Sequence, residues 1–270
     1  MKRSQFLQNT ALGLGAALLL GACGGGEETA TAPEASGDGP VWLVGTEPAF
    51  PPFESQGDDG ELVGFDIDLM NAIGEEAGVQ VEFESLPFDG LIPALQSGTI
   101  EAAISGMTIT EERAETVDFS RPYFRAGLAI ATAEDNTEIT SIDDLEGKTI
   151  AVQLGTTGAD MANGIPDASV STFDSAPLAL QELSNGNADA VINDAPATLD
   201  AIATGNIEGV TVVGELLTEE FYGIAMPQDS ENLETLNAAL TTIIENGTYD
   251  SIYEKWFGTT PEGTLPESAL

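Results

Sequence analysis

The sequence has few cations, a single cysteine and no histidine. Among its 270 residues, seven Lys and Arg stand against 46 Asp and Glu. Without His, the usual general base and a common metal ligand are missing. One Cys excludes an internal disulfide and a Cys-based zinc site. Because a formal charge of −39 repels phosphates, we expect no nucleic-acid partner. We also expect that the protein binds no metal and no cofactor.

The excess of acid has two explanations, a cation-binding site or an adaptation to concentrated salt. The acids are scattered along the chain, and no stretch has the spacing of an EF-hand calcium loop. The hydrophobic content of 42% is that of a folded protein. We therefore favour a halophilic protein, in which salt screens the repulsion between acidic side chains.

The first 40 residues indicate export and anchoring. A basic start precedes an apolar run, Ala11 to Leu20, that is too short to span a membrane. The next residues, up to Cys23, resemble the lipobox of bacterial and archaeal lipoproteins, in which the Cys is lipidated; the alternative is a buried Cys in a helix. We predict a signal peptide over residues 1–22 and a flexible tether over 23–40. The protein would then be extracytoplasmic, lipid-anchored to the outer face of the cytoplasmic membrane, or periplasmic.

From Val41 onward, short apolar runs alternate with amphipathic ones. Leu69, Ile73 and Ala77 recur every four residues and mark the buried face of one helix. Alternating strands and helices predict an α/β fold with mainly parallel sheets. The predicted strands are Val41–Gly45, Val79–Glu84, Ala102–Ser105, Ile150–Gln153, Ala190–Asn193 and Val210–Val213, and the predicted helices are Phe65–Ala77, Leu91–Ser97, Ala176–Asn185, Pro196–Thr204 and Leu233–Glu245.

Polar residues lie at the ends of three of these strands. They are Ser105-Gly106, Gln153 with the following Gly155, and Asn193-Asp194. Since ligands bind at the carboxyl ends of the strands in open α/β sheets, we expect these residues at a binding site.

Arg113 is the most informative single residue, because only five Lys and Arg follow residue 22. It lies shortly after Gly106 and Thr108, and a guanidinium there suits a carboxylate held by two parallel hydrogen bonds. The alternative is a surface Arg paired with a neighbouring Glu on a short helix.

Several motifs occur in order along residues 41–260. They are GFDIDL at 64–69, FDGLIPAL at 88–95, GMTITEER at 106–113, VDFS at 117–120 and NGTYDSIYEKWFG at 246–258. Together they resemble the family 3 extracellular solute-binding proteins of polar amino-acid ABC importers, and within that family the glutamine-binding members in particular.

The resemblance implies a two-lobed clamp of the periplasmic-binding-protein type, in which each lobe is a sheet flanked by helices. Lobe one would comprise residues 41–122 and 223–260, and lobe two residues 128–217. Two crossing strands, within 123–127 and 218–222, would form the hinge, and the lobes would close on the ligand. Such a protein delivers an amino acid to an ABC permease of the membrane, and we expect it to be a monomer.

The resemblance also implies how the constant part of an amino acid is bound. Arg113 would bind the α-carboxylate, helped by the hydroxyl and N–H of Thr108 and by the N–H of Thr157 at a helix N-terminus. The carbonyl of Gly106 and the carboxylate of Asp194 would accept from the α-ammonium. Pairing both charges is required, because burying an unpaired charge is costly. For Asp194, a helix N-cap is the alternative role.

For the ligand's side chain, the resemblance implies Phe50 and Phe88 as two walls, although both are also plausible core residues. Glu47, Gln153 and Asn193 would contact the polar end. The glutamine-binding members have Asp, Lys and His at these three positions, so this chain keeps an acid and loses a cation. We expect a neutral polar ligand, with glutamine first and a basic amino acid next.

Two other classes of protein share this fold. Cyclohexadienyl and arogenate dehydratases need a proton donor over the substrate ring, and this chain has no His and no paired-carboxylate motif to supply one. Ligand sensors are usually fused to transmembrane and kinase segments. We therefore predict a binding protein and not an enzyme.

Overall fold

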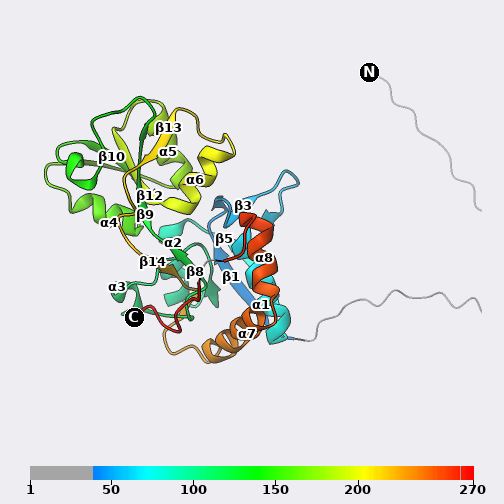
Figure 1. Ribbon diagram of the computed structural model, residues 1–270. Coiled ribbons are helices and arrows are strands. Elements are labelled where there is room, and N and C mark those ends of the chain that lie inside the picture. Colours follow the sequence, from blue (N-terminus) through cyan, green and yellow to red (C-terminus); the bar gives the residue numbers. More distant parts are fainter. Residues whose placement is uncertain (1–38, 262) are drawn as a thin grey trace, which may run out of the picture. The chain divides into compact units, whose positions relative to one another are not determined.

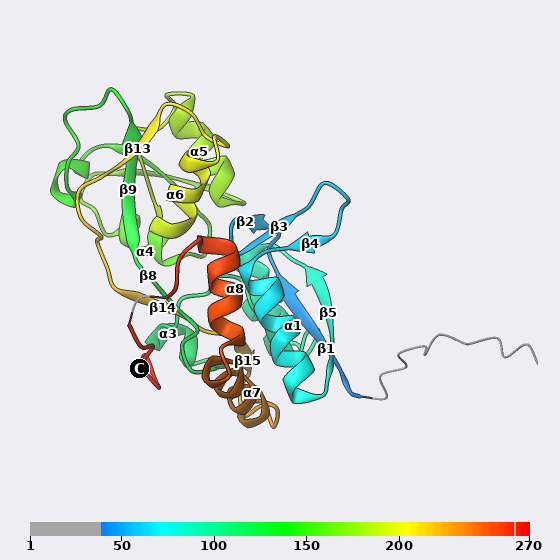
Figure 2. The same ribbon diagram turned by 45° about the vertical axis from the view of Figure 1, so that its right-hand side comes forward.

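The computed structural model describes residues 39–261 and 263–270 (Figures 1 and 2). The predicted signal peptide, the lipidation site Cys23 and all but the last two residues of the predicted tether lie outside these ranges. None of the helices in the described ranges combines the length and the hydropathy of a membrane span.

The chain forms two lobes, each built around a five-stranded sheet (Figure 1). In lobe one the strand order is β5-β1-β6-β15-β7, and in lobe two it is β11-β10-β12-β9-β13. The strands of lobe one are β1 (Val41–Thr46), β5 (Gln80–Ser85), β6 (Ala102–Ala103), β7 (Val117–Phe119) and β15 (Ala225–Pro227). Those of lobe two are β9 (Leu128–Ala133), β10 (Thr149–Gln153), β11 (Ser169–Phe173), β12 (Ala190–Asp194) and β13 (Val210–Val213).

Both sheets are mainly parallel, as predicted, but each contains one reversed strand, β15 in lobe one and β9 in lobe two. β1 runs parallel to β5 and β6, whereas β15 runs antiparallel to β6 and β7. In the same way β10 is parallel to β11 and β12, and β9 is antiparallel to β12 and β13. The reversal has a topological cause. β9 and β15 each enter a sheet directly from the segment that crosses between the lobes, and not through a βαβ connection.

Two short strands connect the lobes. β8 (Phe124–Ala126) and β14 (Glu220–Tyr222) pair in an antiparallel ribbon, with Phe221 opposite Arg125. Figure 2 shows this ribbon, which we call the crossing pair, between the two sheets. The exact limits of the lobes and the hinge role of the crossing pair stay predictions.

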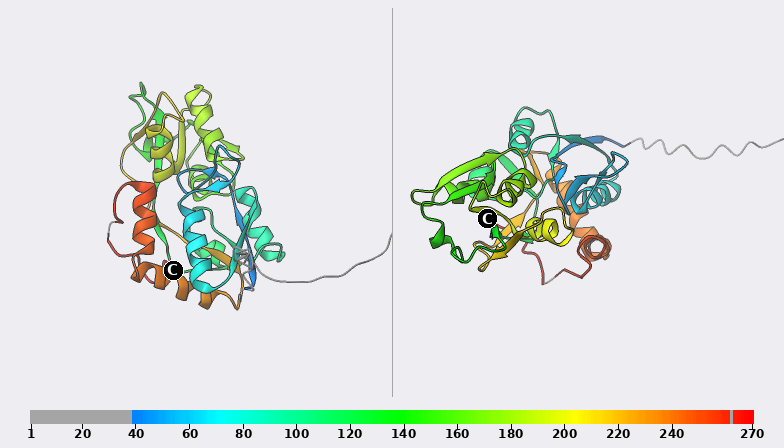
Figure 3. Two further views of the ribbon diagram at one scale, coloured as in Figure 1. Left: turned by 90° about the vertical axis from the view of Figure 1, so that its right-hand side faces the viewer. Right: turned by 90° about the horizontal axis from the view of Figure 1, so that it is seen from above.

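All five predicted helices are present, and two of them, α1 (Phe65–Ala77) and α7 (Leu233–Glu245), begin and end at the predicted residues. In α1, Leu69 and Ile73 are fully buried, as the four-residue spacing predicts. α1 packs against both α7 and α8 (Figure 3). The other helices are α2 (Phe88–Gln96), α3 (Glu111–Ala114), α4 (Thr157–Asn163), α5 (Ala176–Ser184), α6 (Ala195–Ala203), α8 (Thr248–Phe257) and the 3₁₀ turn Ile142–Leu145; a small sheet comprises β2 (Ala49–Phe50), β3 (Glu54–Gln56) and β4 (Leu62–Val63).

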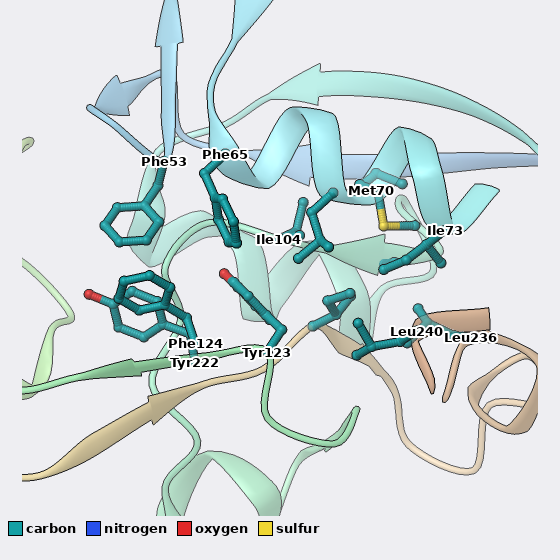
Figure 4. Close-up of a cluster of buried hydrophobic side chains, with 14 of the residues drawn as sticks. Phe53, Phe65, Met70, Ile73, Ile104, Tyr123, Phe124, Tyr222, Leu236 and Leu240 are labelled. Atoms are coloured by element: carbon teal, nitrogen blue, oxygen red, sulfur yellow. The ribbon is translucent and has the colours of Figure 1, made fainter. Parts of the chain in front are cut away.

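An aromatic cluster fixes the crossing pair to lobe one (Figure 4). Phe124 of β8 stacks on Tyr222 of β14, with ring centroids 5.6 Å apart, and contacts Phe53 edge-on at 4.9 Å. Such contacts stabilise beyond the area they bury. The hydroxyls of Tyr123 and Tyr222 point out of this cluster and donate hydrogen bonds to Asp66 and Asp194, respectively. The packing of the rings therefore also places polar groups near the cleft.

Candidate ligand-binding site

A small pocket lies between the lobes, with a cavity of about 10 Å³, which is about the space that one water molecule needs. Its lining comes largely from the carboxyl ends of strands, where ligands of open α/β sheets bind. The lining residues are Glu47, Phe50, Phe88, Ser105, Gly106, Thr108 and Arg113 from lobe one, and Gln153, Thr156, Thr157 and Asp194 from lobe two.

Nine of the ten residues predicted to contact the ligand line this pocket. The tenth, Asn193, does not, because neighbouring residues of a strand point to opposite faces and Asp194 faces the pocket. The side-chain amide of Asn193 instead donates to the hydroxyl of Thr198 at 3.0 Å. Ser105, which was expected at the binding site from its place at a strand end, also lines the pocket. Sequence reasoning missed Thr156, which adjoins the predicted Thr157, and Glu220, for which the sequence carries no signal.

Arg113 points toward the second lobe. Its Nη1 donates to the carbonyl of Thr108 at 2.7 Å, and its Nη2 donates to the carbonyl of Gly155 at 3.0 Å across the cleft. The guanidinium also lies over the ring of Phe88, 5.4 Å from the centroid. Within the described ranges it forms no ion pair, so the alternative of a surface pair with a neighbouring Glu is wrong. Three of its five N–H groups are left for a ligand.

Asp194 is buried at the opposite side of the cleft. It occupies the N-cap position of α6, yet in the described chain its side chain makes no capping hydrogen bond, which argues against the capping role. Instead, its Oδ1 accepts from the hydroxyl of Tyr222 at 2.8 Å. Burial, and then the nearby charge of Glu220, raises the pKa of Asp194 to about 7. A cationic group beside Asp194 would stabilise its charged form.

Glu47 and Gln153 meet across the cleft. The Nε2 of Gln153 donates to Oε2 of Glu47 at 2.7 Å, and both side chains are buried. Burial raises the pKa of Glu47 to about 7, although the hydrogen bond from Gln153 opposes the shift and the charge of Asp89 adds to it. This end of the pocket therefore holds an acid whose only close protein partner in the described structure is a neutral amide.

Two fully buried acids support the loop at Ser105-Gly106. The Ser105 hydroxyl donates to Glu54 at 2.7 Å, and the Gly106 N–H donates to Asp66 at 2.9 Å. Burial raises the pKa of both acids, that of Asp66 to about 6, and the charge of Asp66 raises that of Glu54 further. Gly106 has a φ of 54°, and a Cβ there would lie 2.9 Å from the Phe50 ring, so the loop requires glycine.

Glu220 of the crossing pair binds three hydroxyls. Its Oε2 accepts from Thr108 at 2.7 Å and from Thr157 at 3.1 Å, and its Oε1 accepts from Thr218 at 3.0 Å. Glu220 is 8% exposed and lies behind the two pocket-lining threonines. In the ranges that the structure describes, no group of His, Cys, Asp and Glu is arranged to hold a metal ion.

Comparison with known proteins places these residues in a family. The model of the bacterial extracellular solute-binding proteins, family 3, matches residues 43–259. A probable histidine-binding protein of Neisseria gonorrhoeae is 36% identical over 247 residues, which are 89% of this chain and 91% of the relative. The arginine-binding periplasmic protein of Mannheimia haemolytica is 39% identical over 223 residues, or 80% of this chain and 91% of the relative.

Solved structures agree. An ancestral arginine-binding protein bound to arginine has 49% identity and a TM-score of 0.78, with 81% of this chain and 98% of that chain covered. An ancestral arginine-binding protein bound to glutamine has 49% identity and a TM-score of 0.75, with the same coverage. The two-lobed fold is thus that of periplasmic binding proteins, and this chain belongs to the family 3 bacterial extracellular solute-binding proteins.

Proposed function

We propose that this solute-binding protein binds a basic amino acid, with arginine first, and delivers it to an ABC importer. The charge of the pocket carries the proposal. Among the described residues that line it, two are acids, Glu47 and Asp194, and one is a cation, Arg113. Their formal sum is −1, and the net charge of +1 on arginine or lysine balances it. Glutamine, which is neutral overall, would leave one buried acid without a cation, and that is costly.

The constant part of the ligand fits the end of the pocket that contains Arg113 and Asp194. Arg113 has N–H groups left for two parallel bonds to an α-carboxylate. Asp194 and the carbonyl of Gly106 supply acceptors for the α-ammonium. The side chain of arginine would then extend between Phe50 and Phe88 toward Glu47, where its guanidinium meets the acid. Asn193 is not part of this proposal, because its amide bonds Thr198.

Glutamine is the second candidate, and one observation favours it. Burial raises the pKa of Glu47 to about 7, so that near neutral pH a fraction of the protein holds a neutral Glu47 beside the amide of Gln153. A neutral pair of this kind suits a ligand amide. Of the two ancestral arginine-binding protein structures at 49% identity, one has arginine bound and the other glutamine.

A thermal-shift screen against the common amino acids tests the proposal. The purified chain should first be unfolded and refolded, so that ligand bound during expression is lost, and the screen should be run in concentrated salt. We expect the largest rise in melting temperature with arginine, followed by lysine, because a ligand that binds only the folded state stabilises it. A rise with glutamine alone would exchange the order of the two candidates, and no rise with any amino acid would contradict both.

We infer a binding and not a catalytic role. The described residues that line the pocket include no His, Lys, Tyr or Cys, so Glu47 and Asp194 are its candidate general acids, and both are held by hydrogen bonds from neighbouring side chains. The dehydratase alternative is tested directly by incubating the protein with prephenate and arogenate. Formation of phenylpyruvate or phenylalanine above the blank would contradict a pure binding role.

We also propose that the protein is a salt-adapted lipoprotein anchored through Cys23. Mass spectrometry of the protein from its native membrane should show a diacylglyceryl group on Cys23, and a Cys23→Ser variant should leave the membrane fraction. An unmodified N-terminus would contradict the anchor. Because salt screens the repulsion between 46 acids, the melting temperature should rise from dilute buffer to about 1 M salt. Equal melting temperatures would contradict the adaptation.

A further inference from the structure

We propose that Glu220 is a positioning residue that couples closure of the lobes to recognition of the ligand's α-ammonium group. The inference rests on the proposed function, since it concerns an amino acid bound between the lobes. Glu220 was not among the residues predicted from the sequence, and it acts on the ligand through its neighbours.

The first argument is the geometry of a single oxygen atom. Oε2 of Glu220 accepts from Thr108, which belongs to lobe one, and from Thr157, which begins α4 of lobe two. Glu220 itself lies on β14 of the crossing pair. Both bonds form only when the lobes are as close as they are here, and opening would separate Thr157 from Thr108. The closed protein therefore has a hydrogen bond between Glu220 and Thr157 that the open protein lacks, and this bond stabilises closure.

The second argument is the direction of these hydrogen bonds. An ionised carboxylate only accepts, and a threonine hydroxyl has one hydrogen to donate. Since Thr108 and Thr157 both donate to Glu220, their oxygens can offer only lone pairs to the pocket. Lone pairs suit an ammonium and repel a carboxylate. The expectation that the Thr108 hydroxyl donates to the α-carboxylate is thereby revised, and the carboxylate is left to Arg113 and to backbone N–H groups.

The third argument is that strand β14 positions both side chains that we expect to accept hydrogen bonds from the ammonium, namely Asp194 and Thr108. Residues two apart on a strand share a face, and in β14 Glu220 and Tyr222 are buried while Phe221 between them is partly exposed. Tyr222 donates to Asp194, and Glu220 orients Thr108. Placing Asp194 and Glu220 near one another is unfavourable in the empty closed protein, because both are acidic. A ligand ammonium removes that repulsion, so closure with ligand is favoured over closure without it.

The test compares two ligands and two variants by isothermal titration calorimetry. The ligands are L-arginine and 5-guanidinopentanoate, which is arginine without its α-ammonium; glutamine and glutaramate serve instead if glutamine binds more tightly. The variants are Glu220→Gln and the matched Glu219→Gln. Glu219 is the preceding residue, its side chain is 64% exposed, and it pairs with Arg125 and not with the pocket.

We expect Glu220→Gln to weaken the binding of L-arginine by roughly 10- to 100-fold and that of 5-guanidinopentanoate much less. The reason is that the amide of Gln presents a hydrogen-bond donor where the carboxylate accepted hydrogen bonds from the threonines. The preference for the ammonium should shrink, and Glu219→Gln should bind as wild type does. A general structural defect would weaken both ligands in equal proportion, and that result, or an unchanged preference, would overturn the role of Glu220.

A second variant guards against a folding failure of Glu220→Gln. Thr157→Val removes one of the two hydroxyls and leaves Glu220 in place. It should also weaken L-arginine, and in the double variant with Glu220→Gln the two losses should be smaller than additive, since they break one network. Full additivity, or a Thr157→Val variant that binds as wild type does, would contradict the coupling. If wild type binds no amino acid, the proposed function itself fails.

Discussion

The two ends of the pocket each hold a buried carboxylate, and they differ in what surrounds it. Asp194 lies beside Arg113, Tyr222 and Glu220, so its end contains charges of both signs and a bridge between the lobes. Glu47 at the other end has the neutral amide of Gln153 as its hydrogen-bond partner. Burial raises the pKa of both acids to about 7. The two acids thus have similar pKa values, but Asp194 lies among charged groups of both signs, whereas Glu47 is paired with a neutral amide.

The difference teaches where binding and where selectivity arise. The Asp194 end is built from a strand end, a loop with an obligatory glycine and the crossing pair, and in the proposed binding mode it holds the part that all amino acids share. The Glu47 end is built from two side chains that meet only across the cleft. Changes at the first end should therefore abolish binding of every amino acid, whereas changes at the second should alter which one binds.

The largest expected effect is that of Arg113→Ala. A buried α-carboxylate without its cation costs about 3–5 kcal/mol, so calorimetry should detect no binding of arginine or glutamine at concentrations that saturate wild type. Arg125→Ala is the control, because Arg125 is half exposed and pairs with Glu219. Affinity of the Arg113 variant within about threefold of wild type would remove Arg113 from the site.

Glu47→Gln should show that the two ends of the pocket have different roles. It removes the acid that we pair with the ligand's guanidinium. The binding free energy of arginine should therefore weaken by about 1.5–3 kcal/mol, the value of a hydrogen bond to a charged group. Glutamine should bind as well as before or better, because no buried charge is then left unpaired. Glu82→Gln, on an exposed position of β5, is the matched control. Equal losses for both ligands would mean that Glu47 does not set selectivity.

Phe88→Ala should act on both ends alike. Phe88 forms one wall of the pocket and lies under the guanidinium of Arg113. Its loss should cost arginine and glutamine about 1–2 kcal/mol each, from lost apolar contact and lost cation–π attraction. Phe88→Leu, which keeps an apolar wall, should recover the larger part. A loss confined to one ligand would place Phe88 at one end only.

The pH dependence is the most diagnostic effect. Glu47 and Asp194 have folded pKa values of about 7, above the ordinary values of 4.5 and 3.8. Their contribution to the stability of the empty protein is therefore present at low pH and lost as pH rises through about 7. Arginine favours the ionised acids, so its affinity should rise with pH across the same window, by at most about tenfold per unit for each acid.

Differential scanning fluorimetry from about pH 5 to about pH 8.5, with and without arginine, measures both trends. The melting temperature of the empty protein should fall with pH, and the shift caused by arginine should grow. In Glu47→Gln the growth should be reduced. A shift that stays constant with pH would show that neither acid changes its protonation on binding.

Sequence patterns were enough to predict the α/β fold and the bounds of α1 and α7, and the family resemblance supplied ten contact residues, nine of which line the pocket. Those residues lie in short motifs or at strand ends. The directions of β9 and β15 were not predictable, because they depend on where the chain crosses between the lobes. Asn193 was placed in the site because it ends a predicted strand and because the resemblance implies a ligand contact at that position, although strand geometry turns its side chain away from that of Asp194.

Glu220 escaped prediction for a different reason. Two of its three hydroxyl partners, Thr108 and Thr157, are 112 and 63 residues away in the sequence, and only the closed two-lobed fold brings them together. The same holds for Glu54 under Ser105, 51 residues apart. Acids that support a site from behind carry no local motif, so they are found from contacts and burial.

The central claim is that the pocket carries one acid more than a neutral amino acid can satisfy. Its most direct test is the ratio of the arginine and glutamine affinities of refolded wild type, measured by calorimetry at about pH 8, where both acids are mostly ionised. We predict that arginine binds more tightly by at least about tenfold. Equal affinities, or tighter binding of glutamine, would contradict the account.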